Sequence, residues 1–306
     1  MFVTHSDRDS LAPTRSPLER RLRVLGEGFP ELREAAETYR VVLSVLRDAP
    51  GNAAPVAIAA EDVAGKLARG EPLLAGAMLV FDLDATRSLA IRLAEALARR
   101  GVAKAAPVGL ALARERFPLE RLLKHAVAGE CAFVRTLARV LGVDPALLDV
   151  VAQNAVKPAL RAWSRQLALP ARGLSWERGY CFVCGARAAL AELRGNELTR
   201  HLRCGRCGAD WGVRRLLCPF CGNENPSSLG FLHTGEPMET GRVEVCDGCG
   251  EYLKVVTRFD PGAPEEVVAD DLATLPLDYA ARARGYTCCT VSRSWRTRGT
   301  ASFPRQ

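Results

Sequence analysis

The sequence predicts an α+β protein of more than one domain, with an N-terminal all-α helical bundle followed by two small cysteine-rich ribbons. Up to about residue 170, apolar residues recur at the 3.6-residue spacing of helices. After residue 180, short strand-like runs alternate with glycine-rich turns, and eight of the eleven cysteines fall between residues 181 and 249. The length of 306 residues is enough for about two domains.

The same change of pattern predicts where the chain divides, with the main boundary near residues 170 to 173. The residues before Pro17 have little apolar content, which is typical of a mobile arm, and the last residues are rich in arginine. The expected segments are a mobile arm (1–16), a helical domain (17–170), a first metal ribbon (171–215), a second metal ribbon with a C-terminal segment (216–286) and an atypical basic tail (287–306).

Five apolar stripes at helical spacing mark the helices of the first half. They lie within residues 32–46, 89–97, 119–126, 133–141 and 148–163. The last stripe predicts one continuous helix that ends before Pro170, and a further helix is expected between Ala53 and Leu67. In the second half, strands are expected at 198–202, 243–245 and 252–258.

The paired cysteines are the most informative feature of the second half. They form four Cys-x-x-Cys pairs, which are Cys181/Cys184, Cys204/Cys207, Cys218/Cys221 and Cys246/Cys249. Two such turns complete a tetrahedral shell of four thiolates around one metal ion, as in zinc ribbons and rubredoxin. The pairs are separated by 19, 10 and 24 residues, so we expect the first pair to join the second and the third to join the fourth.

A glycine follows each pair directly, at positions 185, 208, 222 and 250. A metal-binding turn continues with positive φ, where a residue without Cβ has no steric penalty. The glycines therefore meet a backbone requirement of metal-binding turns. Disulfides are the alternative, but the N-terminus lacks an apolar signal segment, which favours metal sites in a reducing cytoplasm.

The identity of the metal is left open by the residues alone. A tetrathiolate cage accepts zinc, which would be structural, or iron, which could also exchange one electron. The remaining cysteines are not expected to take part. We expect Cys131 to be a small buried apolar residue, and Cys288 and Cys289 are adjacent and cannot form the same turn. His201 is expected to be satisfied by a neighbour or exposed.

Charge and motifs argue against two other classes of protein. The formal net charge is +7, but residues 279 to 306 contain six arginines and no acidic residue, which leaves 7 − 6 = +1 for the rest. This distribution argues against a nucleic-acid-binding face. No nucleophile elbow, phosphate-binding loop or open zinc motif is present, so an enzyme is disfavoured. The acidic segment 270–278 is expected to be a helix start, or an element that docks a partner or braces a ribbon.

With these motifs in view, the chain resembles the formate dehydrogenase accessory (formation) protein family, FdhE, over residues 17 to 286. The resemblance depends on the four cysteine pairs and on the residues around them, in particular Asp210-Trp211, Cys218-Pro219-Phe220-Cys221, Tyr252-Leu253-Lys254, Asp270-Asp271-Leu272 and Gly285-Tyr286. Two departures stand out: Phe182 occupies a position where the family usually has proline, and the chain after Tyr286 differs from the family's usual ending.

The resemblance implies a cytoplasmic maturation factor that is not an enzyme and contacts the catalytic subunit of a respiratory, molybdenum-dependent formate dehydrogenase. It implies two rubredoxin-like metal sites per chain, with iron as the expected ion and zinc as the alternative, held by the eight paired cysteines. The charge distribution predicts no nucleic-acid partner, and the longest apolar run, Leu73 to Phe81, is too short for membrane insertion. A homodimer is possible. The alternatives are a rubredoxin-like electron-transfer protein and a nucleic-acid-binding zinc-ribbon protein.

Overall fold

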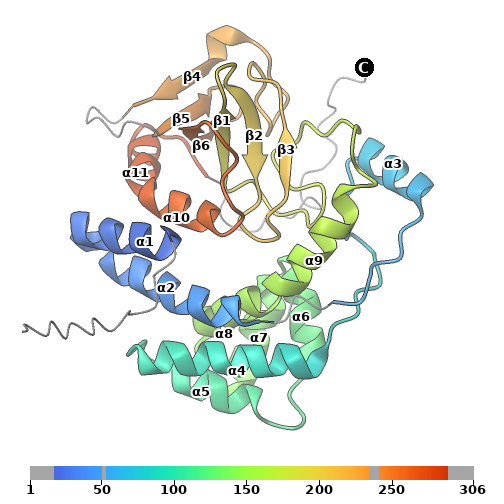
Figure 1. Cartoon of the computed structure of the whole chain (residues 1–306), viewed down its shortest axis with the longest axis vertical. Coiled ribbons are helices and arrows are strands. Elements are labelled where there is room, and N and C mark those ends of the chain that lie inside the picture. The colour runs from blue at the N-terminus through green and yellow to red at the C-terminus, as the bar shows by residue number, and fades with distance from the viewer. Residues whose placement is uncertain (1–16, 50–52, 234–240, 289–306) are drawn as a thin grey trace, which may run out of the picture.

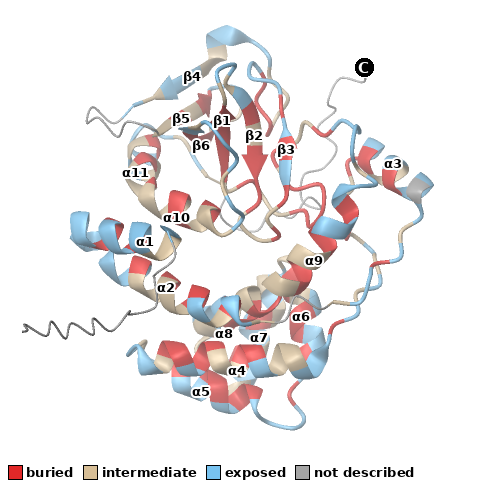
Figure 2. Cartoon of the chain, viewed as in Figure 1, coloured by how far each residue is buried: buried red, intermediate tan, exposed pale blue. Residues whose placement is uncertain are grey.

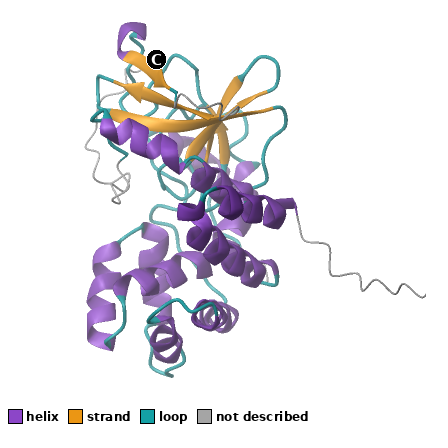
Figure 3. Ribbon diagram, turned by 90° about the vertical axis from the view of Figure 1, so that its left-hand side faces the viewer, coloured by secondary structure: helices purple, strands orange, loops and turns teal. Residues whose placement is uncertain are grey.

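A computed structural model of the chain describes residues 17–49, 53–233 and 241–288. A helical half and a half built on one β-sheet lie one above the other (Figure 1). A view turned by 90° separates the strands from the helical half (Figure 3). The α+β class is therefore confirmed. The arm expected at 1–16 and most of the expected basic tail lie outside the described residues, and the segment boundaries stay predictions.

The helical half has one short 3-10 helix, η1 (Pro30–Leu32), and a series of α-helices within the described residues. In chain order the α-helices are α1 (Pro17–Gly28), α2 (Arg33–Arg47), α3 (Ala60–Ala68), α4 (Leu83–Arg99), α5 (Ala105–Leu112), α6 (Leu119–Ala128), α7 (Cys131–Leu141), α8 (Pro145–Ala155) and α9 (Lys157–Ala168). Each predicted apolar stripe lies on one or two of these helices.

The stripe expected to form one continuous helix belongs to two helices, so that prediction was wrong. α8 ends at Ala155, and α9 begins at Lys157 with Pro158 in its first turn. Proline has no N–H for the hydrogen bond of a helix interior, and its ring clashes with the preceding turn. The helix is therefore interrupted at Val156, while Val151 and Trp163 on either side of the interruption are both buried.

The described residues of the second half form a single six-stranded sheet. Its strands are β1 (Leu190–Arg194), β2 (Thr199–Arg203), β3 (Asp210–Gly212), β4 (Leu229–Leu232), β5 (Gly241–Cys246) and β6 (Glu251–Arg258), and η2 (Pro226–Ser228) precedes β4. The order across the sheet is β3-β2-β1-β6-β5-β4. β1 pairs with β6 in parallel, and the other neighbouring strands are antiparallel. The two expected ribbons are thus fused through the β1–β6 pair.

Two C-terminal helices, α10 (Glu266–Ala273) and α11 (Leu275–Ala283), cover one face of the sheet (Figure 1). On β5, Val243 and Val245 pack with Leu277 and Ala281 of α11. Side chains alternate between the faces of a strand, so Glu244, between these valines, projects from the opposite face. On that opposite face, Ala191, Leu202 and Val255 pack into the apolar core shared with the helical half.

One apolar core runs through both halves of the molecule. It includes Leu93 of α4, Trp163 of α9, Cys204 of the first ribbon and Val255 of β6. Figure 2 shows the buried residues in β1, β2 and α4 on both sides of the junction. The helical half therefore supplies apolar surface that a small cysteine-rich module lacks on its own.

Candidate metal centres

The eight paired cysteines gather into two groups of four in the structure. The first group is Cys181, Cys184, Cys204 and Cys207, and the second is Cys218, Cys221, Cys246 and Cys249. In each group the sulfur atoms all lie within 4.8 Å of one another. The grouping is the one that the linker lengths predict.

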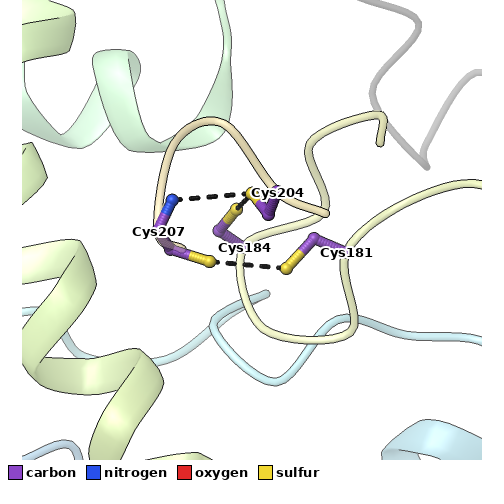
Figure 4. Close-up of side chains that lie close together, drawn as sticks. All are labelled: Cys181, Cys184, Cys204 and Cys207. Carbon is purple, nitrogen blue, oxygen red and sulfur yellow. Dashed lines mark hydrogen bonds between the residues drawn. The ribbon is translucent and has the colours of Figure 1, made fainter. Parts of the chain in front are cut away.

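The sulfur separations agree with a tetrahedral site. In the first group, Cys181 Sγ lies 3.5 Å from Cys207 Sγ, and Cys184 Sγ lies 3.6 Å from Cys204 Sγ (Figure 4). The corresponding separations in the second group are both 3.7 Å. Four sulfurs at about 2.3 Å from one ion form a tetrahedron with edges of about 3.8 Å. A disulfide needs about 2.05 Å, so these are not disulfide pairs.

Each cysteine turn is closed by a backbone hydrogen bond from the glycine that follows it. The Gly185 amide donates to the Cys181 carbonyl at 2.9 Å, and the Gly222 amide donates to the Cys218 carbonyl at 2.8 Å. All four of these glycines have positive φ, between 67° and 77°. The backbone requirement predicted from the sequence is confirmed, and a side chain at these positions would strain the turn.

Further donors point at the sulfur atoms. The Val183 amide donates to Cys181 Sγ at 3.4 Å, and the Cys207 amide donates to Cys204 Sγ at 3.5 Å. In the second group, the Asn223 side-chain amide donates to Cys246 Sγ at 3.4 Å. Such bonds stabilise negative charge on sulfur, as second-sphere groups do around bound metals. The donor sets therefore fit an ion such as Zn²⁺ or Fe²⁺.

The titration behaviour of the thiols also fits a cation site. Burial raises the pKa of Cys181 well above its ordinary value. Hydrogen bonds from neighbouring thiols lower the pKa of Cys204, and such bonds, chiefly from Cys249, lower that of Cys218 to about 5. One thiolate in each group is therefore stabilised at the expense of its neighbours. A full set of four thiolates needs a cation, so metal binding would release protons.

The two groups differ in their exposure to solvent. In the first group no cysteine is more than 9% exposed. In the second group Cys218 and Cys246 are buried, whereas Cys221 and Cys249 are only half-buried. The first group lies inside the molecule, and the second is reached from the surface.

The first group lies at the junction with the helical half. The Leu73 and Leu74 amides donate to the Phe182 and Val183 carbonyls, at 2.7 and 2.9 Å. On the other turn of this group, the Arg206 side chain donates to two carbonyls at the end of α6. The turns that carry these cysteines thus also hold the two halves together, a role that the sequence alone did not indicate.

The acidic segment 270–278 acts as a brace between the helices and the sheet. Asp270 pairs with Arg258 of β6 at 2.5 Å and with Arg21 of α1. Lys254 of β6 pairs with Asp271 at 2.5 Å and with Asp278 at 2.7 Å. Of the three expected roles, the bracing of a ribbon is the one that these contacts support. Asp270 and Asp271 lie inside α10 and not at its start, although α11 does begin within the segment, at Leu275.

Among the described residues, Cys131, Cys288 and His201 lie outside both groups. His201 Nδ1 lies 2.8 Å from a carboxylate oxygen of Asp210, so the histidine is satisfied as expected. Cys131 begins α7 and is half-buried, so its prediction as a small buried apolar residue was wrong. A helix start exposes its first turn, which the apolar neighbours in the sequence do not reveal. Cys288 is half-buried and joins neither group, and Cys289 lies outside the described residues.

Together, the fold and the two cysteine groups define a class of protein: a helical half joined to a sheet that carries two tetracysteine centres of the zinc-ribbon or rubredoxin kind. Residues 217–292 match the family described as "FdhE, C-terminal domain". The crystal structure of the FdhE protein from Pseudomonas aeruginosa is similar over 88% of this chain and 91% of that chain, with a TM-score of 0.56 and 28% sequence identity. These comparisons support the resemblance to the FdhE family, in sequence over the C-terminal part and in fold over most of the chain.

Curated relatives are similar to this chain over a shorter stretch. Protein FdhE of Escherichia coli O127:H6 is 33% identical over 119 residues, and protein FdhE of Shigella boydii serotype 18 is 32% identical over 119 residues. Each match spans 38% of this chain and 37% of the relative's length. In the described ranges, none of the helices combines the length and apolar character needed to cross a bilayer.

Proposed function

We propose that this chain is a cytoplasmic accessory protein, not an enzyme, that binds the catalytic subunit of a respiratory formate dehydrogenase during its maturation. The observation that carries the proposal is the second cysteine group together with its brace. Both lie within residues 217–292, the stretch that matches the FdhE C-terminal domain. The second centre is partly exposed, at Cys221 and Cys249, and is held by a sheet, so it offers a rigid surface to a partner protein.

In this proposal all eight paired cysteines hold metal, one ion in each group, with iron as the expected ion and zinc as the alternative. When bound, the ion would supply folding free energy and, in the case of iron, one-electron redox chemistry. Elemental analysis of anaerobically purified protein measures both identity and amount. Two metal ions per chain support the proposal, and fewer than one would contradict it.

Affinity capture of the formate dehydrogenase catalytic subunit tests the docking role. We expect the Cys218→Ser/Cys221→Ser variant to capture much less subunit than the wild type, because the turn that carries both residues loses its ion. Cys131→Ser is the matched control, since Cys131 is half-buried at the start of α7, outside both groups. Equal capture by a folded double variant would show that the second centre has no part in docking.

A second candidate function is electron transfer through a rubredoxin-like iron. The half-buried state of Cys221 and Cys249 favours it, because electron exchange requires a centre close to the surface. Protein with iron in this centre should be red and bleach reversibly with reductant. Colourless protein that holds two zinc ions per chain would exclude this candidate.

A further inference from the structure

A cavity of about 250 Å³ lies beside the second cysteine group, and Cys218 and Cys246 are among its lining residues. Its floor is the face of the sheet opposite α11, where Arg242 and Glu244 of β5 project. Its wall is the chain segment 215–220, which carries Cys218. We call this site the β4 groove, because Leu229, Gly230 and Phe231 of β4 form its outer side.

The wall of the β4 groove is held in place by one buried arginine. Nη1 of Arg200 donates to the carbonyls of Arg214, Arg215 and Leu217, at 3.2, 3.0 and 3.0 Å. The Arg200 side chain is only 2% exposed. The groove is therefore formed before any partner binds, and its shape is linked to the turn that carries Cys218.

The β4 groove carries an exposed positive charge at Arg215. Arg200, Arg215 and Arg242 line it together with two glutamates. Glu244 is shared by Arg200 at 3.5 Å and Arg242 at 3.0 Å, and Glu251 pairs with Arg187 outside the cavity. The Arg215 side chain is exposed. The groove thus offers the Arg215 guanidinium, with Arg242 beside it in the lining, to an incoming carboxylate.

Two large apolar side chains stand exposed at the rim. Leu216 is 67% exposed on the wall, and Phe231 is 59% exposed on β4. β4 is also the last strand of the sheet in its order, so its outer edge can accept an extended chain. A cavity of about 250 Å³ is below the roughly 300–1,000 Å³ of sites for drug-sized ligands and suits single side chains of a peptide.

We propose that the β4 groove binds an extended acidic peptide segment of the client protein. A large apolar side chain of that segment enters between Leu216 and Phe231, and a neighbouring aspartate or glutamate faces Arg215 and Arg242. The inference rests on the proposed function, because it names the surface and the peptide chemistry by which the catalytic subunit is recognised.

Overlapping synthetic peptides that tile the formate dehydrogenase catalytic subunit are the probe, with fluorescence anisotropy on full-length, metal-loaded protein as the measurement. We expect binding to be confined to peptides that combine acidic and large apolar residues. Phe231→Ala and Arg215→Gln should each weaken binding by about tenfold, as loss of an interface anchor does. Binding should also weaken as salt is raised, because surface charges are screened.

Phe259→Ala and Arg139→Gln are the matched controls. Phe259 is 71% exposed just after β6, and Arg139 is exposed on α7, and neither lines the groove. Both controls should bind the peptides as the wild type does. Circular dichroism should show that the groove variants fold normally, since both altered side chains are largely exposed.

The outcomes of these experiments distinguish failure of the β4 groove assignment from failure of the proposed function. If wild type, Phe231→Ala and Arg215→Gln capture the intact subunit equally, the docking role is upheld and the β4 groove is not the binding site. If wild-type protein captures no subunit, the proposed function fails and the groove fails with it. Selection of basic peptides, or a homodimer that Phe231→Ala dissociates, would also overturn the assignment, the latter by showing that the groove holds a second copy.

Discussion

Replacement of Glu192 by alanine should destabilise the fused sheet. Glu192 of β1 is fully buried and lies among three arginines. Its carboxylate accepts from Arg203 Nη1 at 2.6 Å and from Arg194 Nε at 2.7 Å, and Arg258 Nε lies 3.5 Å away. These contacts link β1 and β2 of the first ribbon to β6 of the second.

The expected loss of stability depends on which carboxylate partners the arginines keep in Glu192→Ala. Removal of one partner from a buried ion pair costs about 3–5 kcal/mol, because the remaining charge stays desolvated. Here Asp210 still pairs with Arg194, and Asp270 still pairs with Arg258. The low end, about 3 kcal/mol, is therefore expected, which corresponds to a fall in Tm of about 6–12 °C at 2–4 °C per kcal/mol.

Differential scanning calorimetry of metal-loaded protein measures this change. Glu197→Ala is the matched control, because Glu197 is exposed in the turn between β1 and β2. It should change the free energy of unfolding by less than about 0.5 kcal/mol. A Glu192→Ala variant that melts within about 2 °C of Glu197→Ala would refute the argument that the buried charge network joins the ribbons.

Three further predictions concern the metals, the junction and pH. A chromogenic chelator should remove metal in two kinetic phases, with the second centre first, because Cys221 and Cys249 are half-buried while the first centre is sealed. Arg206→Ala should lower the free energy of unfolding by about 1–3 kcal/mol in urea titrations, because two carbonyls at the end of α6 lose their charged donor. Burial alone would raise the pKa of Asp210, but hydrogen bonds from His201 and Arg194 lower it overall. Its stabilising contribution is thus present above the ordinary aspartate pKa and is lost as pH falls through the folded-state pKa.

Each of these three predictions has a control variant or a result that would contradict it. Single-phase metal release at one rate would contradict the difference between the centres. Arg139→Ala, on the exposed face of α7, should leave the unfolding curve unchanged. For Asp210→Asn, the stability difference from wild type should be constant above about pH 5 and shrink below about pH 4, and a difference that grows on acidification would contradict the sign.

The local features of the centres could be predicted from sequence because they depend on short stretches of chain. A Cys-x-x-Cys turn and the glycine after it fix the backbone within a few residues, so the grouping of cysteines and the positive φ of Gly185 were predictable. The stripes of most helices were predictable for the same reason. The exposure of Cys131 was not predictable, because it depends on where α7 begins.

The sequence by itself determined the kind of protein: a helical half, two tetracysteine groups and the pairing within them, because periodicity, spacing and glycine placement are local properties. Only the tertiary structure decided that both ribbons share one sheet through the β1–β6 pair, that the first centre is sealed at the junction, and that the second opens beside the β4 groove. These depend on contacts between residues far apart in the chain, such as Leu73 with Phe182 and Glu192 with Arg258. Neither partner's local sequence encodes such a contact, since its free energy arises only when the whole core forms.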